Sequence, residues 1–150
     1  MNKNIITSGG IVLKDNQILF IYKKGKWDLP KGKIEDGKKR RETAIIETSE
    51  ETGLPESELK ILKKAIPTYY YKEINGETIL KKTYWYVIEF IGSISRSLIP
   101  DQHEGITECK WCSIDNLDDV LNDSYERVRY LIDFFLKSPT YERYKQKNKF

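Results

Sequence analysis

Residues 83–91, TYWYVIEFI, are the stretch that most restricts how this chain can fold. Nearly every residue in the stretch is apolar or aromatic, which predicts a central β-strand covered on both faces. Asn75-Gly76 separates it from another β-rich run and is a strong signal for a tight hairpin turn. The fold must therefore place further structure on each side of a sheet.

The rest of the pattern supplies those layers. Residues 8–24 predict two short strands around an Asp15-Asn16 turn, and residues 106–114 predict another strand. A helix is expected over residues 40–52, because Gly53 and Pro55 end it. A short helix is expected within residues 113–121, capped by Ser113 or Asp115, and an amphipathic helix within residues 124–137. This order predicts a mixed sheet flanked by helices on two sides.

Size and charge limit the classes of function. The 150 residues fit a single domain, residues 1–150, in which the polar, basic tail at about 138–150 is expected to be loose. The 26 basic and 23 acidic residues nearly balance, so nucleic-acid binding is not predicted except through local clusters. The opening residues lack the apolar segment of a signal peptide, and no apolar run approaches membrane-spanning length. We therefore expect a cytoplasmic protein without a membrane partner.

Cys109 and Cys112 form a C-x-x-C motif that raises the question of zinc or redox chemistry. In a strand, a spacing of three residues places the two thiols on opposite faces of the sheet. The chain has no second cysteine pair, and its one histidine is His103. We interpret both residues as ordinary cysteines of a strand in a reducing compartment.

An acidic cluster lies in the expected helix of residues 40–52. Glu47, Glu50 and Glu51 project from one face of that helix, where like charges repel one another. The cluster could be a solvated acidic face, or it could hold a hard divalent cation such as Mg²⁺ or Mn²⁺ through oxygen ligands. The loop Pro30-Lys31-Gly32-Lys33 precedes it and offers backbone groups and ammonium groups to a phosphate. This context favours the cation.

The combination resembles the signature of the Nudix hydrolase family. The positions that match its spacing are Gly32, Glu47, Glu50, Glu51, Gly53 and Leu54, and WDLPKGKIEDG resembles the usual lead-in. The signature covers 23 residues, and the order of strands around it fits the family's fold. The resemblance implies an α/β (α+β) protein, namely a Nudix-type α/β/α sandwich with a mixed β-sheet.

The resemblance also implies an activity and a set of ligands. Members of the family use a divalent metal and water to hydrolyse a nucleoside diphosphate linked to another group. Glu47, Glu50 and Glu51 would be the catalytic residues and the metal ligands, with the backbone carbonyl of Lys31 as a further ligand. Glu47 is the first candidate for the general base. Family members often supply one more acid from a loop such as residues 101–105, which makes Glu104 a candidate ligand or base.

Three positions depart from the family's pattern. Lys38 replaces its first glutamate, Ile46 replaces its arginine, and Thr48 replaces an aliphatic residue. Ile46 matters most, because the arginine is expected to orient the carboxylates. The basic run of residues 38–41 could be a solvated face, could attract polyphosphate or RNA ends, or could bring Lys38 back onto the acids.

Residues that could contact substrate lie around the same motif. Lys31, Gly32 and Lys33 are candidates for phosphate contact, and His103 could also touch the substrate. Trp27, Tyr84 and Tyr86 could stack on a base, although core packing is favoured for the two tyrosines of the central strand. At least one side chain among residues 69–71 is expected to be exposed, because the three tyrosines alternate along a strand.

These observations predict a Mg²⁺-dependent Nudix pyrophosphohydrolase that acts on a small nucleotide. Its WDLPKGK and TYWYVIEF segments look most like those of members acting on diadenosine polyphosphates or similar nucleotides. The alternative is a catalytically impaired Nudix-fold module that senses nucleotides or binds a partner, as Lys38 and Ile46 suggest. A third hypothesis is action on RNA 5′ ends through the basic run and the basic tail.

Overall fold

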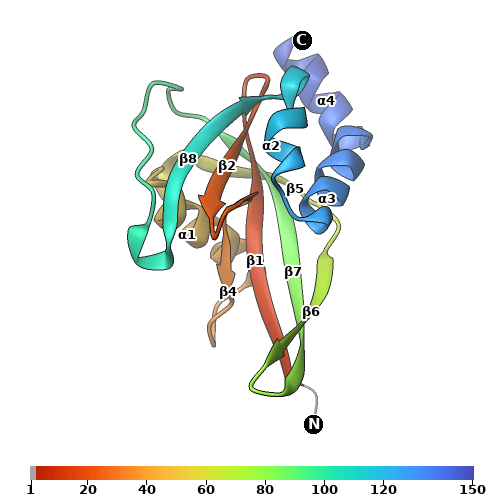
Figure 1. Ribbon diagram of the computed structural model, residues 1–150. Helices are drawn as coiled ribbons and strands as arrows, with labels where there is room; N and C mark the ends of the chain where they lie inside the picture. The colour runs from red at the N-terminus through yellow and green to blue at the C-terminus, as the bar shows by residue number, and fades with distance from the viewer. Residues whose placement is uncertain (1–2) are drawn as a thin grey trace.

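The computed structural model of the protein describes residues 3–150 (Figure 1). It contains one mixed sheet of eight strands. The strands are β1 (Lys3–Lys14), β2 (Gln17–Lys23), β3 (Lys26–Asp28), β4 (Lys31–Lys33), β5 (Leu59–Lys64), β6 (Thr68–Ile74), β7 (Glu77–Phe90) and β8 (Ile106–Ser113). The helices are α1 (Arg40–Thr52), α2 (Asp118–Asn122), α3 (Glu126–Leu136) and α4 (Pro139–Asn148), with short 3-10 turns η1 (Glu56–Glu58), η2 (Gln102–Glu104) and η3 (Ile114–Asn116).

The strand order along the sheet is β3-β2-β1-β7-β5. Strand β4 pairs with β1, β6 pairs with β7, and β8 pairs with β2. Strands β1 and β7 run parallel over residues 3–13 and 79–89, whereas the other pairs are antiparallel. The predicted mixed sheet is confirmed, and β7 lies inside it as expected.

Helices cover both faces of the sheet (Figure 1). On one face, α2, α3 and α4 cover a core that includes Trp85 and Val87 of β7. On the other face, α1 covers a core that includes Tyr86 and Ile88 of the same strand. Successive side chains of β7 therefore enter opposite layers of an α/β/α sandwich, which explains its almost uninterrupted apolar sequence.

The two cysteines of β8 follow the same alternation. Cys112 is buried in the core beneath α2–α4, and Cys109 packs against the core beneath α1. Both are free thiols. The expectation that they lie on opposite faces is correct.

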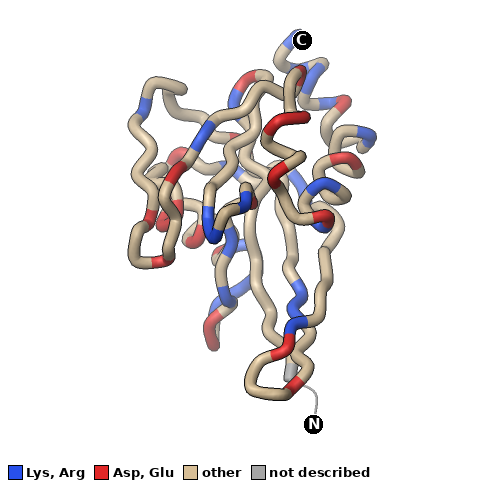
Figure 2. Tube along the Cα trace, viewed as in Figure 1, with Lys and Arg blue, Asp and Glu red and all other residues tan. Residues whose placement is uncertain are grey.

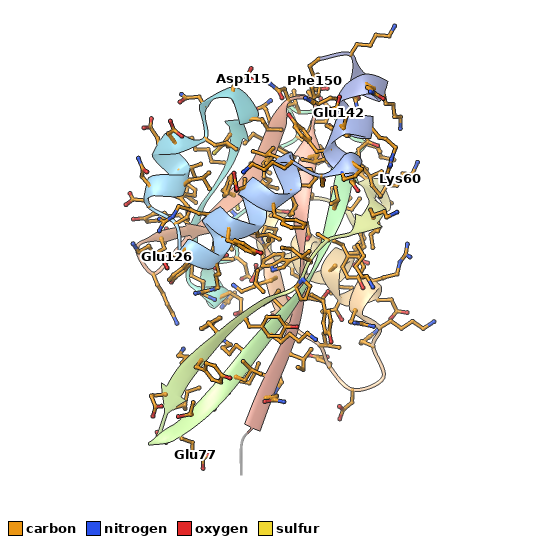
Figure 3. All side chains as sticks on the ribbon, turned by 90° about the vertical axis from the view of Figure 1, so that its right-hand side faces the viewer. Lys60, Glu77, Asp115, Glu126, Glu142 and Phe150 are labelled. Atoms are coloured by element: carbon orange, nitrogen blue, oxygen red, sulfur yellow. The ribbon has the colours of Figure 1, made fainter. Side chains whose placement is uncertain are left out.

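The tail is not loose, contrary to the expectation from its polar composition. Ser138 caps α4 by accepting a hydrogen bond from the Tyr141 amide at 3.3 Å, and Pro139 occupies the first turn. Tyr141 and Tyr144 are buried in the core on this face. Figure 3 shows α3 and α4 lying across the sheet, with Glu142 on α4. The two tyrosines form an apolar stripe on a helix whose overall composition is polar.

The strand register separates β1 from β2 beyond their hairpin turn. Strands β1 and β2 pair only next to their hairpin turn, through Leu13 with Ile18 and Lys14 with Gln17. Farther from the turn, β1 pairs with β4 instead, where Ser8 lies opposite Gly32. The Gly10 amide also donates to the Pro30 carbonyl at 3.0 Å. The loop before α1 is thereby fastened to β1, while β2 diverges from β1.

None of the helices in residues 3–150 combines the length and the apolar character required to cross a membrane.

Candidate active site

Helix α1 packs against β1 and β4 and places the acidic residues near the point where β2 has separated from β1. It begins after Lys39, whose side chain makes no capping hydrogen bond, and Glu42 is the only acidic residue of its first turn. It ends at Gly53, whose φ of 80° suits glycine and whose amide donates to the Ser49 carbonyl. Ala44 and Thr48 are fully buried on the inner face. The same helical phase leaves Glu47, Glu50 and Glu51 along one side of the buried stripe.

These carboxylates line a cavity of about 440 Å³. We call it the acidic cavity. Its carboxylates are Glu35, Glu47, Glu50, Glu51 and Glu104, and its lysines are Lys23, Lys31, Lys33 and Lys81. Figure 2 shows acidic segments of α1 and of the turn before β8 near basic segments of the neighbouring strands. The structure thus brings together the predicted residues of α1, the loop at residues 31–33 and Glu104, which come from distant parts of the sequence.

Strand β4 holds one of the glutamates and leaves room for another. The Lys31 amide donates a hydrogen bond of 2.9 Å to Oε1 of Glu51, which is only 4% exposed. A Cβ atom at Gly32 would lie 2.1 Å from the Glu47 carboxylate, so only glycine allows that carboxylate to approach the backbone so closely. The Lys31 ammonium forms an ion pair of 3.0 Å with the buried Asp28. The backbone of β4 therefore orients Glu51, at a site whose helix lacks the family's arginine.

The acidic cavity carries more negative charge than its neighbours neutralise. Burial, together with Glu50 and Glu104, raises the pKa of Glu47 to about 7. Burial also raises the pKa of Glu51 to about 8, although the Lys31 amide and ammonium oppose this change. Both carboxylates resist ionisation chiefly because they are removed from water, and for Glu47 the neighbouring carboxylates add to this effect. A cation would relieve this cost.

The side chains around the cavity offer the type of ligand atom that a hard divalent cation prefers. All five acidic side chains around the cavity offer oxygen, which Mg²⁺ and Mn²⁺ prefer. Within residues 3–150, however, no three carboxylate, imidazole or thiol groups are already close enough together to form a metal site. Glu50 is exposed, and no hydrogen bond or ion pair within the described residues holds its side chain. Side-chain movement, chiefly of such exposed carboxylates, is therefore needed before a cation is enclosed.

The three departures from the family's pattern have different surroundings. Ile46 is half-buried on α1, and Thr48 is fully buried. Lys38 is exposed and lies outside the lining of the acidic cavity, so it does not compensate for the missing arginine in this structure. The Arg40 guanidinium lies 4.2 Å from the ring centre of Tyr84, and its backbone carbonyl accepts a hydrogen bond from Ser8. Part of the basic run therefore packs onto the protein.

Four of the candidates for substrate contact lie outside the lining of this cavity. Trp27 packs against the core beneath α2–α4, with its ring 4.9 Å from that of Tyr22. Tyr84 lies between Arg40 and Lys82, which is 4.4 Å from its ring centre. His103 is exposed in η2, beside Glu104. Tyr86, only 5% exposed, belongs to the core, as favoured from its strand position.

Sequence reasoning missed several residues of the cavity, notably Lys23, Glu35 and Lys81. Lys81 shares one face of β7 with Thr83 and Trp85, so strand alternation places it on the side opposite Tyr84. Lys23 ends β2 at the point where β2 has separated from β1. Alternation alone could identify the face of Lys81, but the position of Lys23 depends on the divergence of the strands.

Another cavity, of about 360 Å³, lies between the β5–β6 connection and α3. Its lining is mostly apolar and includes Ile66, Pro67, Phe134 and Phe135, with Lys64 as its one charged residue. It lacks the convergent polar groups that a site for chemistry on phosphates requires. The acidic cavity is therefore the candidate active site.

Comparisons with known proteins identify the family to which the chain belongs. A family model described as the NUDIX domain matches residues 5–134. An RNA pyrophosphohydrolase from Dinoroseobacter shibae (strain DSM 16493 / NCIMB 14021 / DFL 12) is 29% identical over 115 residues, which are 68% of this chain and 71% of that protein. A putative mutator protein, MutT4, from Mycobacterium tuberculosis (strain CDC 1551 / Oshkosh) is 33% identical over 101 residues, which are 67% of this chain and 38% of that protein.

Solved structures share the fold. A C. elegans Ap4A hydrolase, in a binary complex, superposes with a TM-score of 0.66 at 19% identity, covering 87% of this chain and 94% of that one. A bifunctional NMN adenylyltransferase/ADP ribose pyrophosphatase from Francisella tularensis, complexed with AMP and a Mn ion, gives a TM-score of 0.62 at 20% identity. That match covers 89% of this chain and 41% of the other. At these identities the likeness establishes the architecture.

Proposed function

The chain belongs to the Nudix family, and from this premise we propose that it is a divalent-cation-dependent hydrolase of phosphoanhydride bonds in nucleotides. The substrate is a nucleoside diphosphate linked to another group, and a dinucleoside polyphosphate is the class we favour. The observation that carries the proposal is the convergence of Glu47, Glu50, Glu51 and Glu104 on one cavity that also presents lysines. Oxygen donors for a cation and ammonium groups for phosphates meet in a single site.

The residues have separable tasks. Glu47, Glu50, Glu51 and Glu104 would hold Mg²⁺ or Mn²⁺, together with the Lys31 carbonyl. A bound cation supplies the positive charge that neutralises the phosphate oxygens during hydrolysis. Lys31 and Lys33 bind and orient the phosphates from the loop at β4. Glu47 is the candidate general base, because its carboxylate lies against Gly32 in the same loop and so faces the bound phosphates.

A screen of purified protein with Mg²⁺ or Mn²⁺ tests the activity. The substrates are diadenosine polyphosphates, ADP-ribose, nucleoside triphosphates and a 5′-triphosphorylated RNA, with released phosphate and nucleotide products measured. We expect turnover that requires the cation, and we expect Glu51→Gln to reduce kcat by at least about 100-fold, because misplaced catalytic groups lose rate steeply. Absence of turnover on every class at high enzyme concentration would refute the proposal.

Glu42→Gln is the matched control for Glu51→Gln. Glu42 lies on the same helix, but it is exposed and outside the acidic cavity. The change removes the same charge, so its kcat should stay close to that of the unchanged protein. An equal loss in both variants would assign the effect to the charge of α1 rather than to the site.

Two alternatives are decided by the same screen. Ile46 and Lys38 leave open a module that binds nucleotides without turning them over, which robust activity abolished by Glu51→Gln would exclude. RNA 5′ ends are the second candidate substrate, because curated relatives are named RNA pyrophosphohydrolases. If the protein releases pyrophosphate from the RNA faster than it cleaves the nucleotides, the substrate is the RNA 5′ end and not a dinucleoside polyphosphate.

A further inference from the structure

A second polar cavity, of about 310 Å³, adjoins the acidic cavity. We call it the basic cavity. Six of its nine lining residues are cationic, namely Lys23, Lys24, Lys31, Lys72, Lys81 and Arg127, and the others are Asp28, Tyr70 and Tyr125. Its one carboxylate, Asp28, is 8% exposed and paired with Lys31 at 3.0 Å. The remaining positive charges therefore lack carboxylates of this cavity to neutralise them.

The two cavities share three residues. Lys23, Lys31 and Lys81 line both of them, so the acidic and basic cavities are adjoining parts of one cleft. Lys23 marks the boundary, since its ammonium is 4.0 Å from Glu104 of the acidic cavity. A ligand held by the carboxylates through a cation would meet lysines next, and then Arg127.

Arg127 is fixed in position by two aromatic rings. Its guanidinium carbon lies 3.8 Å from the ring centre of Tyr70 and 4.1 Å from that of Tyr125. Tyr70 comes from β6 and Tyr125 precedes α3, so two segments far apart in sequence hold the guanidinium. In Figure 3, the label of Glu126 marks the first residue of α3, which lies away from α4. A guanidinium stacked in this way loses little entropy when it binds a planar or tetrahedral anion.

The pKa of Tyr70 reflects the positive charge of the basic cavity. Burial raises the pKa of this tyrosine, but Lys81, Arg127 and Lys31 outweigh that effect and lower the pKa below its usual value. A neutral phenol is thus held in an environment that stabilises an anion. A phosphate group entering the cavity would benefit from the same field.

We propose that the basic cavity binds phosphate groups lying beyond the scissile phosphoanhydride, with Arg127 as the clamp, so that the site selects nucleotides with more than two phosphates in the chain. This specificity rests on the proposed hydrolase function, but the anion binding does not. Arg127 offers a bidentate fork, and Lys72 and Lys81 add point charges along the path. A two-phosphate substrate such as ADP-ribose would leave this cavity without a phosphate.

Equilibrium binding tests the clamp without any turnover. Inorganic tetraphosphate is titrated into the purified protein in the presence of EDTA, and the heat of binding gives the Kd. We expect Arg127→Gln to raise the Kd by about tenfold or more, as expected for a charge-assisted hydrogen-bonded pair. Lys137→Gln, a neutralisation at an exposed position beyond the end of the same helix, should change the Kd by less than about twofold.

Kinetics tests the selectivity. Arg127→Gln should lower kcat/KM for diadenosine tetraphosphate by about tenfold or more, and it should leave kcat/KM for ADP-ribose within about twofold. Lys72 also lines the cavity, but it is not stacked between rings. Lys72→Gln therefore provides a second test if Arg127→Gln lowers the melting temperature. We expect a smaller loss from Lys72→Gln in the same direction.

The outcomes separate the two proposals. Tetraphosphate binding that depends on Arg127, in a protein without turnover, would support the basic cavity and refute the hydrolase. Equal losses on diadenosine tetraphosphate and ADP-ribose, or equal weakening by Arg127→Gln and Lys137→Gln, would overturn the basic cavity while the hydrolase stands. If Arg127→Gln weakens a 5′-monophosphorylated single-stranded RNA more than it weakens tetraphosphate, the cavity binds an RNA backbone and the proposal for a nucleotide phosphate chain falls.

Discussion

Thr48 shows how a single hydroxyl group can weaken a helix that also carries a site. It is fully buried on the inner face of α1, and its Oγ1 has no hydrogen-bond partner. A Cβ atom at Gly10 of β1 would lie 3.1 Å from this oxygen, so the hydroxyl faces the closely packed sheet rather than water. Buried polar groups without partners cost free energy. The family's pattern has an aliphatic side chain at this position. The close packing explains this preference, because it leaves a hydroxyl group without a partner.

Thr48→Val should therefore stabilise the protein. Valine has nearly the same shape, so the change removes the unpaired hydroxyl without opening a cavity. We expect the free energy of unfolding to rise by about 1 kcal/mol, and the melting temperature to rise by roughly 2–4 °C. Thermal and urea unfolding followed by circular dichroism measure both quantities.

Thr52→Val is the matched comparison one helical turn later. The Thr52 hydroxyl is also buried, but it donates to the Thr48 carbonyl at 2.6 Å and accepts from the Leu54 amide at 3.3 Å. Its removal should lower the free energy of unfolding by about 1 kcal/mol. If both variants shift stability in the same direction, the pairing of the hydroxyls does not control the effect.

At the scale of elements, α1 and β4 act together as the frame of the candidate active site. The Lys31 amide fixes Glu51, and Gly32 leaves room for Glu47, whereas no hydrogen bond or ion pair within residues 3–150 holds the exposed side chain of Glu50. The backbone of β4 thus supplies part of the orientation that the family's arginine is expected to give. Neither Glu47 nor Glu50 has a hydrogen bond of this kind within the described residues.

Ile46→Arg combined with Lys38→Glu should raise the hydrolase activity. An arginine four residues before Glu50 can pair with it along the helix, and it would also bring positive charge beside Glu47. Better orientation of these carboxylates should increase kcat by about tenfold. Steady-state turnover of the best substrate from the screen measures the change, with Ile46→Leu as the variant that keeps the site apolar. Unchanged or lower kcat in the double variant would mean that β4 already provides all the orientation the site requires.

At the scale of the whole molecule, α4 connects the end of the chain to its beginning. The Tyr144 hydroxyl donates a hydrogen bond of 2.9 Å to the Asp15 carbonyl in the β1–β2 turn. The ring is 4% exposed and packs with Tyr141 in the core beneath α2–α4. Burial, followed by Glu89 and Asp15, raises the pKa of Tyr144 above its usual value. The helix that the composition suggested was loose is thus one of the elements that stabilise the sandwich.

This burial predicts a loss of stability in alkali. Above a pH of about 10 the unfolded chain releases the Tyr144 proton while the folded protein retains it. The stability contributed by this group is therefore complete below pH 10 and falls as the pH rises toward the folded pKa, by at most about 1.4 kcal/mol per pH unit. Urea unfolding between pH 8 and pH 11 measures the slope.

Tyr144→Phe separates the titration from the packing. It should cost about 1 kcal/mol at pH 8 through the lost hydrogen bond, and it should make the decline above pH 10 shallower. Tyr71, whose ring is 72% exposed, provides the comparison, because Tyr71→Phe should leave the slope unchanged. An identical slope in Tyr144→Phe and the unchanged protein would rule out Tyr144 as the group responsible.

Local and periodic features were readable from the sequence. The span of α1 over residues 40–52, the Asn75-Gly76 turn and the central position of β7 depend on backbone conformation and on alternation along one strand, and all agree with the structure. The spacing of the acidic residues also placed Glu47, Glu50 and Glu51 on one side of a helix. These features arise from interactions between neighbours in the chain, which a single sequence displays directly.

Only the tertiary structure decided how distant residues meet. The divergence of β1 from β2 brings Lys23 and Glu104 to α1, and the packing of α3 against β6 places Arg127 between Tyr70 and Tyr125. The tertiary structure also places Trp27 and Tyr84 outside the lining of the acidic cavity, and it buries Tyr144, which lies in a helix with a polar composition. Such contacts depend on strand register and on the packing of layers, and no local pattern encodes them. The acids of the site were therefore determined by sequence spacing, whereas the cations that accompany them were determined by the fold.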